Sequence, residues 1–172
     1  VLSSIWTEDR TFAIKEFSKI CEMAAKYDLK VNLEFVTFAG IKGLTDALEV
    51  LDEVDMPNAY LMVDTLHAHR SNVSPDDLSK VDRNKFGFIH LCDGPAEVPS
   101  LDDPSMIGVA REGRLYPGMG GIDISAYLKA MPSNPVSIEL PNSTEFEKRG
   151  AAGHAAQCLI QAKRYFKENH ID

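Results

Sequence analysis

The sequence has few cysteines and no closely spaced pair of them. Its three cysteines, Cys21, Cys92 and Cys158, lie far apart, and no Cys-x-x-Cys pattern occurs. A zinc ribbon or a disulfide framework needs paired cysteines, so both are disfavoured. Isolated cysteines are typical of a reducing compartment, and we therefore expect a cytoplasmic protein.

Basic residues and long apolar runs are also scarce. The chain carries 18 Lys and Arg against 26 Asp and Glu, which gives a net charge of −8 and a pI of about 5.1. Such a chain is not expected to bind nucleic acid or an anionic membrane through its general charge. No apolar run approaches the roughly 20 residues of a membrane span, and no signal peptide is visible.

What the sequence does contain is an alternation of strand-like and helix-like segments. With 172 residues, 44% of them hydrophobic, it can build one domain with a real core. Thr45 is the expected N-cap of one helix, and Ser74 followed by Pro75 is the expected start of the next. The predicted strands are 1–5, 31–36, 59–64, 86–92 and 136–140, and the predicted helices are 8–27, 45–54, 74–81, 124–131 and about 147–168.

This alternation predicts a parallel sheet built from right-handed β-α-β units. Two architectures meet that description, the doubly wound open sheet and the (β/α)8 barrel. The doubly wound sheet usually has a glycine-rich loop directly after its first strand. Here the glycine-rich run at 117–121 lies inside a long segment from residue 94 to 121, so we favour the barrel.

Each of the last four predicted strands ends in a residue that can bind a metal: Glu34, Asp64, His90 and Glu139. Because side chains alternate across a strand, all four can point inward at the C-terminal mouth of a barrel, where active sites of this fold lie. Three carboxylates and one imidazole suit one divalent cation such as Mn²⁺, Mg²⁺, Co²⁺ or Zn²⁺. A single acid at a strand end is more often an ordinary loop charge, but four strands that end alike favour a metal site.

Several short motifs, taken in order, resemble a known superfamily. They are "LEF", "VDTLHAHRS", "FIHLCDGP", "AREGRLYPGMGGIDISAYLKAMP" and "SIELP". Together they are similar to the sugar phosphate isomerase/epimerase superfamily, the xylose-isomerase-like barrels, over nearly the whole chain. The resemblance implies a (β/α)8 barrel with one divalent metal held by Glu34, Asp64, His90 and Glu139 from strands five to eight.

The resemblance also implies that only part of the barrel is present. A full (β/α)8 barrel takes about 250 residues, and residues 1–172 would supply strands four to eight, the C-terminal part of a single barrel domain. Val1 falls inside a strand-like run, so we expect the chain to lack its N-terminal strands and not to close a barrel alone. Those strands would lie in a longer chain, come from a second chain, or be absent from an open half-barrel; the sequence is compatible with a homo-oligomer.

The chemistry that the resemblance implies is removal of a proton from a carbon next to a carbonyl group. A metal bound to the carbonyl and a neighbouring hydroxyl oxygen stabilises the enediolate that develops, and a carboxylate takes the proton. The resemblance assigns this proton transfer to Glu34 and Glu139. The expected substrate is therefore a small sugar or a cyclic ketone.

Basic side chains near the predicted site are the candidates for substrate binding. The resemblance makes His67 a contact to a substrate oxygen, and it matches Arg70 with a basic residue of some relatives. Arg70 has a salt bridge as its ordinary alternative. Arg111 and Arg114 lie in the long segment after residue 94, where a guanidinium can bind a carboxylate, phosphate or hydroxyl group.

Three further residues in the motifs have less specific expectations. His69 is expected to be an exposed loop histidine. Asp93 either positions His90 or a loop backbone, or caps its own loop. Met119 stands where many relatives carry an acid, so the role of that acid is absent or moved.

We expect a metal-dependent isomerase or epimerase that acts on a small sugar or a related polyol-ketone. The first alternative is a dehydratase of the 3-dehydroshikimate or inosose type on the same site, although that branch often has Gln in place of His90. Endonuclease IV-like DNA repair needs more metal ligands and a surface for a polyanion, which the net charge of −8 disfavours. A fragment without catalytic activity is the last alternative.

Overall fold

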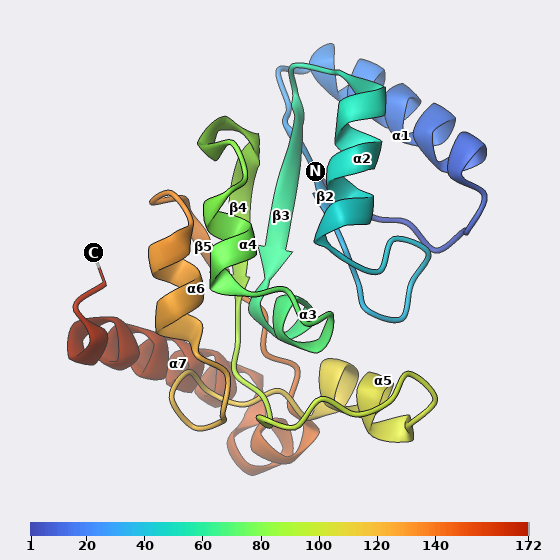
Figure 1. Cartoon of the computed structure of the whole chain (residues 1–172). Coiled ribbons are helices and arrows are strands. Elements are labelled where there is room, and N and C mark those ends of the chain that lie inside the picture. Colours follow the sequence, from blue (N-terminus) through green and yellow to red (C-terminus); the bar gives the residue numbers. More distant parts are fainter. Residues whose placement is uncertain (172) are drawn as a thin grey trace.

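Five parallel strands form a single sheet in the computed structural model, which describes residues 1–171. The strands follow one another across the sheet in chain order, so each connection leads to the neighbouring strand (Figure 1). This is the order of a (β/α) barrel wall, and it confirms the predicted partial barrel. The strands are β1 (Leu2–Ser4), β2 (Val31–Glu34), β3 (Ala59–Asp64), β4 (Phe86–Leu91) and β5 (Val136–Ile138).

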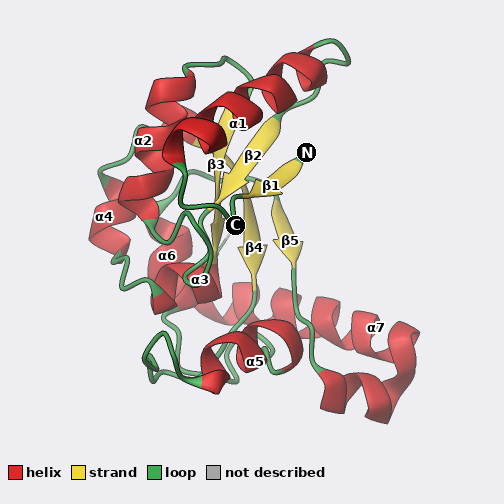
Figure 2. Ribbon diagram, turned by 90° about the vertical axis from the view of Figure 1, so that its right-hand side faces the viewer, coloured by secondary structure: helices red, strands yellow, loops and turns green. Residues whose placement is uncertain are grey.

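Helices cover one side of this sheet. Figure 2 shows α1, α2, α4 and α6 gathered there, while α5 and the start of α7 lie at the end towards which the strands run. A 3-10 turn, η1 (Arg83–Lys85), leads into β4. The helices are α1 (Arg10–Ala25), α2 (Leu44–Val54), α3 (Thr65–Arg70), α4 (Pro75–Ser79), α5 (Pro104–Glu112), α6 (Ile124–Ala130) and α7 (Ser143–Asn169).

The helix starts show where local signals are sufficient and where they are not. Ser74 caps α4 in a complete capping box with Asp77, and Pro75 is its first residue, as predicted. The prediction that Thr45 caps α2 is wrong, because the N-cap is Gly43 and no side chain caps this helix. The closing helix begins at Ser143, before the predicted start, because the Asn142 side chain accepts a hydrogen bond from the Glu145 amide.

The sheet is strongly curved, as the wall of a barrel must be. The register between β3 and β4 shifts after Leu61, which marks a bulge in β4. On the inner face, the Asn32 side chain of β2 reaches across to Gly87 of β4, where a Cβ atom would lie only 1.7 Å from the Asn32 Oδ1. Glycine is required at residue 87 because two strands that are not neighbours approach each other there.

The sheet ends in two open edges. Within residues 1–171, β1 pairs only with β2 and β5 pairs only with β4, so the wall does not close on itself. This agrees with the expectation that the chain does not form a closed barrel. None of the described helices is both long and apolar enough to cross a membrane.

The hydrophobic core lies between the outer face of the sheet and the helices. Leu33 of β2 and Phe35 directly after it are buried there, as are Val63 and Ile89 of the next two strands. Phe17 of α1 packs into the same cluster. Because the core lies on the outer face, the residues on the inner face can form a site at the carboxyl ends of the strands.

Candidate metal centre

The strand register places the four predicted ligands on one face. In a parallel sheet, paired residues share a face, and so do residues two apart in one strand. Asp64 pairs with His90, while Glu34 pairs with Met62, two residues before Asp64. His90 pairs with Ser137, two residues before Glu139, so the four side chains converge on the inner face at the carboxyl ends of β2 to β5.

The ligand atoms of these four residues all lie within 4.8 Å of one another. His90 Nδ1 lies 3.0 Å from Glu139 Oε2, 3.8 Å from Glu34 Oε1 and 4.0 Å from Asp64 Oδ2. Glu34, Asp64 and His90 are buried, whereas the Glu139 side chain is 41% exposed. The structure therefore brings together the residues that the sequence pattern singled out.

Asp64 is held by the helix that follows it. Its Oδ1 accepts hydrogen bonds from the backbone amides of Leu66 (2.8 Å) and His67 (3.1 Å), so Asp64 is the N-cap of α3. This cap uses one carboxylate oxygen and leaves Oδ2 facing the cluster. The short helix α3, which the sequence analysis did not predict, therefore fixes the orientation of the ligand.

Arg114 enters the cluster as a buried cation. Its Nη1 donates hydrogen bonds to Asp64 Oδ2 and to the Glu139 carbonyl (3.3 Å), and it forms an ion pair with Glu139 Oε2 at 3.0 Å without hydrogen-bond geometry. Burial alone would raise the pKa of Asp64, but the Arg114 guanidinium lowers it to about 2. Arg114 was predicted to bind substrate; in the structure it is only 3% exposed and contacts two of the predicted metal ligands.

His90 is surrounded by carboxylates. Burial alone would lower its pKa, but the carboxylates of Glu139 and Glu34 beside it outweigh that effect and raise the pKa to about 9. Its Nδ1 and the Glu139 Oε2 are both buried, and within the described residues neither has a partner with hydrogen-bond geometry. Buried polar atoms without partners are costly, and a divalent cation would satisfy both. The donor set thus fits such an ion.

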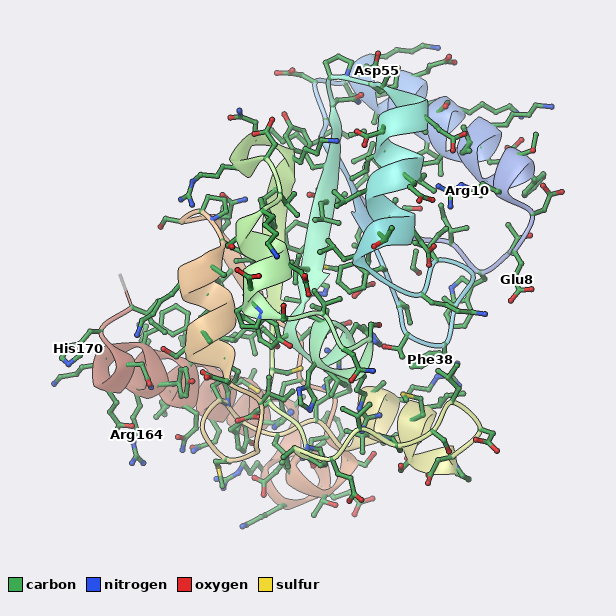
Figure 3. All side chains as sticks on the ribbon, in the orientation of Figure 1. Glu8, Arg10, Phe38, Asp55, Arg164 and His170 are labelled. Atoms are coloured by element: carbon green, nitrogen blue, oxygen red, sulfur yellow. The ribbon has the colours of Figure 1, made fainter. Side chains whose placement is uncertain are left out.

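His67 lies beside the cluster, against the ring of Phe38. It is buried, and burial lowers its pKa, so that the neutral imidazole is favoured. The ring of Phe38, labelled in Figure 3 on the loop after β2, meets the His67 ring edge-on at 5.5 Å between centroids. Trp6 in turn lies 6.0 Å from Phe38 and is 59% exposed. An aromatic row therefore leads from His67 to the surface.

Arg70 and Arg111 are placed differently from Arg114. Arg70 is buried, and its Nη1 donates to the carbonyls of Ser105 (3.0 Å) and Met106 (2.7 Å), which ties α3 to the start of α5. Arg111 is exposed on α5, where it lines a cavity of about 460 Å³ with residues of β5's following loop and α7. The structure does not bring either side chain into the cluster of the four ligands, and their predicted substrate contacts stay predictions.

Asp93 holds the glycine-rich loop. Its Oδ2 accepts from the amides of Gly118 and Gly120, both at 2.9 Å, and its Oδ1 accepts from Gly94 and Ile122. Of the roles considered for Asp93, the structure therefore favours contact with the loop backbone. A Cβ atom on Gly120 would lie 2.4 Å from the Asp93 Oδ1, so a side chain there would displace the carboxylate.

Two residues close to the site were missed from the sequence. Tyr116 is buried in the loop after Arg114, and His154 lies half-buried on α7, where its ring nitrogens bond to Tyr116 and to the Leu140 carbonyl. From the sequence alone, a histidine inside a largely polar helix is predicted to be a surface residue. Only the three-dimensional contact between α7 and the end of β5 reveals its position.

A parallel β/α wall whose strand ends bring three carboxylates and a histidine together defines a β/α-barrel protein with a candidate metal centre. The chain belongs to the xylose isomerase-like TIM barrel family, whose model matches residues 4–162.

Comparison with known proteins agrees with this assignment. The chain is 30% identical over 165 residues to an inosose isomerase of Bacillus licheniformis, a match that covers 90% of this chain and 56% of the relative. An L-ribulose 3-epimerase of Methylomonas is 24% identical over 142 residues, covering 77% of this chain and 42% of the relative. A 3-dehydroshikimate dehydratase of Pseudomonas aeruginosa is 22% identical over 132 residues, covering 74% and 20%.

Among solved structures, the IolI protein with a bound zinc atom superposes with a TM-score of 0.79 at 21% identity, covering 98% of this chain and 62% of that one. This likeness shows the fold. The chain spans about half the length of the inosose isomerases and the epimerase that it matches.

Proposed function

We propose that this chain is the C-terminal, metal-binding part of a single barrel domain that isomerises or epimerises a small sugar or a related polyol-ketone. The observation that carries the proposal is the convergence of Glu34, Asp64, His90 and Glu139 at the carboxyl ends of neighbouring strands. The similarity to an inosose isomerase and an L-ribulose 3-epimerase supports it.

The proposed cofactor is one divalent metal ion. When bound to the four ligands, a cation such as Mn²⁺, Mg²⁺, Co²⁺ or Zn²⁺ would polarise the substrate carbonyl and stabilise the negative charge that develops on it. The guanidinium of Arg114 balances one of the three carboxylates from within the site. The remaining charge of the ligand set then matches a divalent ion.

Proton transfer is assigned to Glu34 and Glu139. They lie at the ends of β2 and β5, with β3 and β4 between them, so their carboxylates reach the cluster from opposite sides. One carboxylate removes the proton from the carbon next to the carbonyl, and the other returns a proton, which inverts a centre or moves the carbonyl group. The Glu139 side chain is 41% exposed, which is consistent with access to a substrate.

His67 is proposed to contact a substrate oxygen. Its Nδ1 is buried and, within the described residues, has no hydrogen-bond partner. A neutral imidazole can donate from one nitrogen, so it can bind a hydroxyl or carbonyl oxygen without adding charge.

A dehydratase is the second candidate, favoured by the similarity to a 3-dehydroshikimate dehydratase. It would use the same proton abstraction and then expel a hydroxyl group as water. The two reactions differ in their products, because loss of water creates a conjugated double bond that absorbs ultraviolet light. Isomerisation or epimerisation creates no such bond.

Hydrogen exchange tests both candidates. The Mn²⁺-loaded protein is incubated in D₂O with a panel of ketoses and cyclic ketones, and deuterium incorporation is followed by NMR, with absorbance recorded in parallel. We expect deuterium next to the carbonyl of at least one substrate, and incorporation that is slower by a factor of about 10² to 10⁴ with Glu139→Gln. Deuterium incorporation without new ultraviolet absorbance indicates an isomerase or epimerase. Deuterium incorporation together with new ultraviolet absorbance indicates a dehydratase. An absence of exchange across the panel in metal-saturated protein would contradict the proposal.

A further inference from the structure

Glu139 lies just beyond the end of an edge strand, and its backbone needs support from outside the sheet. β5 ends at Ile138, and the Glu139 amide donates one hydrogen bond to the Leu91 carbonyl of β4 at 3.2 Å. Within the described residues, β5 has no neighbour on its other side. Hydrogen bonds within the sheet therefore hold the Glu139 backbone on one side only.

The next residue is held by α7. His154 Nε2 lies 2.9 Å from the Leu140 carbonyl oxygen, and His154 Nδ1 lies 2.9 Å from the Tyr116 hydroxyl. A carbonyl oxygen only accepts, so Nε2 donates to it, while Nδ1 lies within hydrogen-bond distance of the Tyr116 hydroxyl, which also lies 3.3 Å from Glu145 Oε2. One imidazole thus connects the peptide after Glu139 to the loop that carries Tyr116.

That loop also carries Arg114, which contacts Glu139 directly. The Arg114 amide donates to the Pro141 carbonyl at 3.1 Å, and the Asn142 side chain donates to the Arg114 carbonyl at 2.9 Å. The segments 113–116 and 139–142 therefore run side by side. His154 and Tyr116 join the two segments at Leu140, the residue that follows Glu139.

We propose that His154, together with Tyr116, is a positioning residue for the metal centre: it fixes the Leu140 carbonyl and thereby the direction of the Glu139 carboxylate. This inference rests on the proposed function of the cluster as a metal site. Neither residue is among the four ligands, and both act through the backbone of the segment that follows β5. Residues that orient ligands from outside the ligand set typically change metal affinity about 10- to 100-fold when they are mutated.

The test compares four variants by titration of the metal-free protein with Mn²⁺ in a calorimeter. His154→Leu removes both ring contacts, whereas His154→Gln keeps an amide that can donate to the Leu140 carbonyl. Tyr116→Phe removes the hydroxyl that bonds to His154. Tyr165→Phe is its matched control, because the Tyr165 hydroxyl accepts from the Ser125 amide at the start of α6 and has no contact with His154 or Leu140 among the described hydrogen bonds. The melting temperature of each variant is measured alongside.

We expect His154→Leu to weaken Mn²⁺ binding at least about 10-fold, and His154→Gln to restore most of the lost affinity. Tyr116→Phe should weaken binding less than His154→Leu but more than Tyr165→Phe, even where the two tyrosine variants melt at the same temperature. Rescue by glutamine separates positioning from a general loss of stability, which would not depend on a donor to Leu140.

The outcomes are distinguishable. If the unmodified protein binds no Mn²⁺, the proposed function fails and the inference falls with it. If the unmodified protein binds Mn²⁺ and His154→Leu binds it equally well, the inference alone is overturned. Should His154→Leu fail to fold, the two tyrosine variants decide: equal affinities in Tyr116→Phe and Tyr165→Phe would overturn it.

Discussion

Asp64 and Glu139 are both carboxylates at the candidate metal centre, but the structure supports them in opposite ways. Asp64 ends a central strand, is 1% exposed, and has one oxygen used as the N-cap of α3. Glu139 follows an edge strand, and its side chain is 41% exposed. Local structure fixes the first, whereas contacts from distant loops and from α7 fix the second. We infer that the Asp64 side of the site is rigid and the Glu139 side adjustable, which would suit the proton transfer proposed for Glu139.

Asp64→Asn changes the rigid side of the site, and we expect it to have the largest effect on the free energy of unfolding. Asparagine can still cap α3, but it cannot balance the buried Arg114 guanidinium, and removing one partner of a buried ion pair costs about 3–5 kcal/mol. We expect the unfolding free energy of the metal-free protein in urea to fall near the lower end of that range, because Glu139 also pairs with Arg114. Mn²⁺ binding should be lost. A fall below about 1 kcal/mol would show that Glu139 alone balances Arg114.

Glu139→Gln tests the adjustable side. Glutamine keeps the shape but cannot act as a base, and a positioned base typically contributes about 10²- to 10⁴-fold to the rate. We expect hydrogen exchange of a substrate to fall by a factor in that range, with little change in melting temperature because the side chain is partly exposed. Glu34→Gln, on the buried side, should lose the same activity. Near-normal exchange in both variants would move the proton transfer to other residues.

Asp93→Asn asks whether the glycine-rich loop supports the adjustable side. The Asp93 carboxylate accepts from four backbone amides, and an asparagine offers only one oxygen to them. Buried donors left without acceptors cost about 1–3 kcal/mol. We expect stability to fall by an amount in that range and limited proteolysis to cut the loop at residues 116–121 sooner. Unchanged cleavage would mean that other contacts hold this loop.

Ser74→Ala is the smallest change and serves as a reference. It removes the capping box of α4, so the unfolding free energy should fall by about 1 kcal/mol. Mn²⁺ affinity should not change, because α4 supplies none of the four ligands. If Mn²⁺ affinity also falls in Ser74→Ala, a general loss of stability would be enough to weaken metal binding. The changes in Mn²⁺ affinity could then not be assigned to Asp64 or Glu139.

The strands and the cluster of ligands could be predicted from the sequence because both depend on short-range regularities. Period-two alternation places Glu34, His90 and their partners on one face, and parallel pairing of neighbouring strands brings the faces together. The capping box at Ser74 is equally local. Each of these features is decided within a few residues of chain.

The remaining features depend on contacts between distant segments. Arg114 contacts Asp64 across 50 residues of chain, and His154 bonds to Tyr116 across 38. The segment around α5 is rich in Gly, Pro and Asp and gives no clear helical pattern, although the Asp103 side chain caps α5. Thr45 has the right chemistry for an N-cap, but the chain enters α2 one residue earlier, at Leu44, because Leu44 itself is buried in the core.

Trp6 is the only tryptophan in the chain, and it lies beside Phe38, whose ring packs on His67. The intrinsic fluorescence of the protein on excitation at the red edge of indole absorption therefore comes from one residue near the mouth of the site. An indole that is 59% exposed emits into water, and any ligand that covers it will shift the emission to shorter wavelength. The molecule thus carries its own optical reporter, with which occupancy of the mouth can be followed in real time without an attached dye.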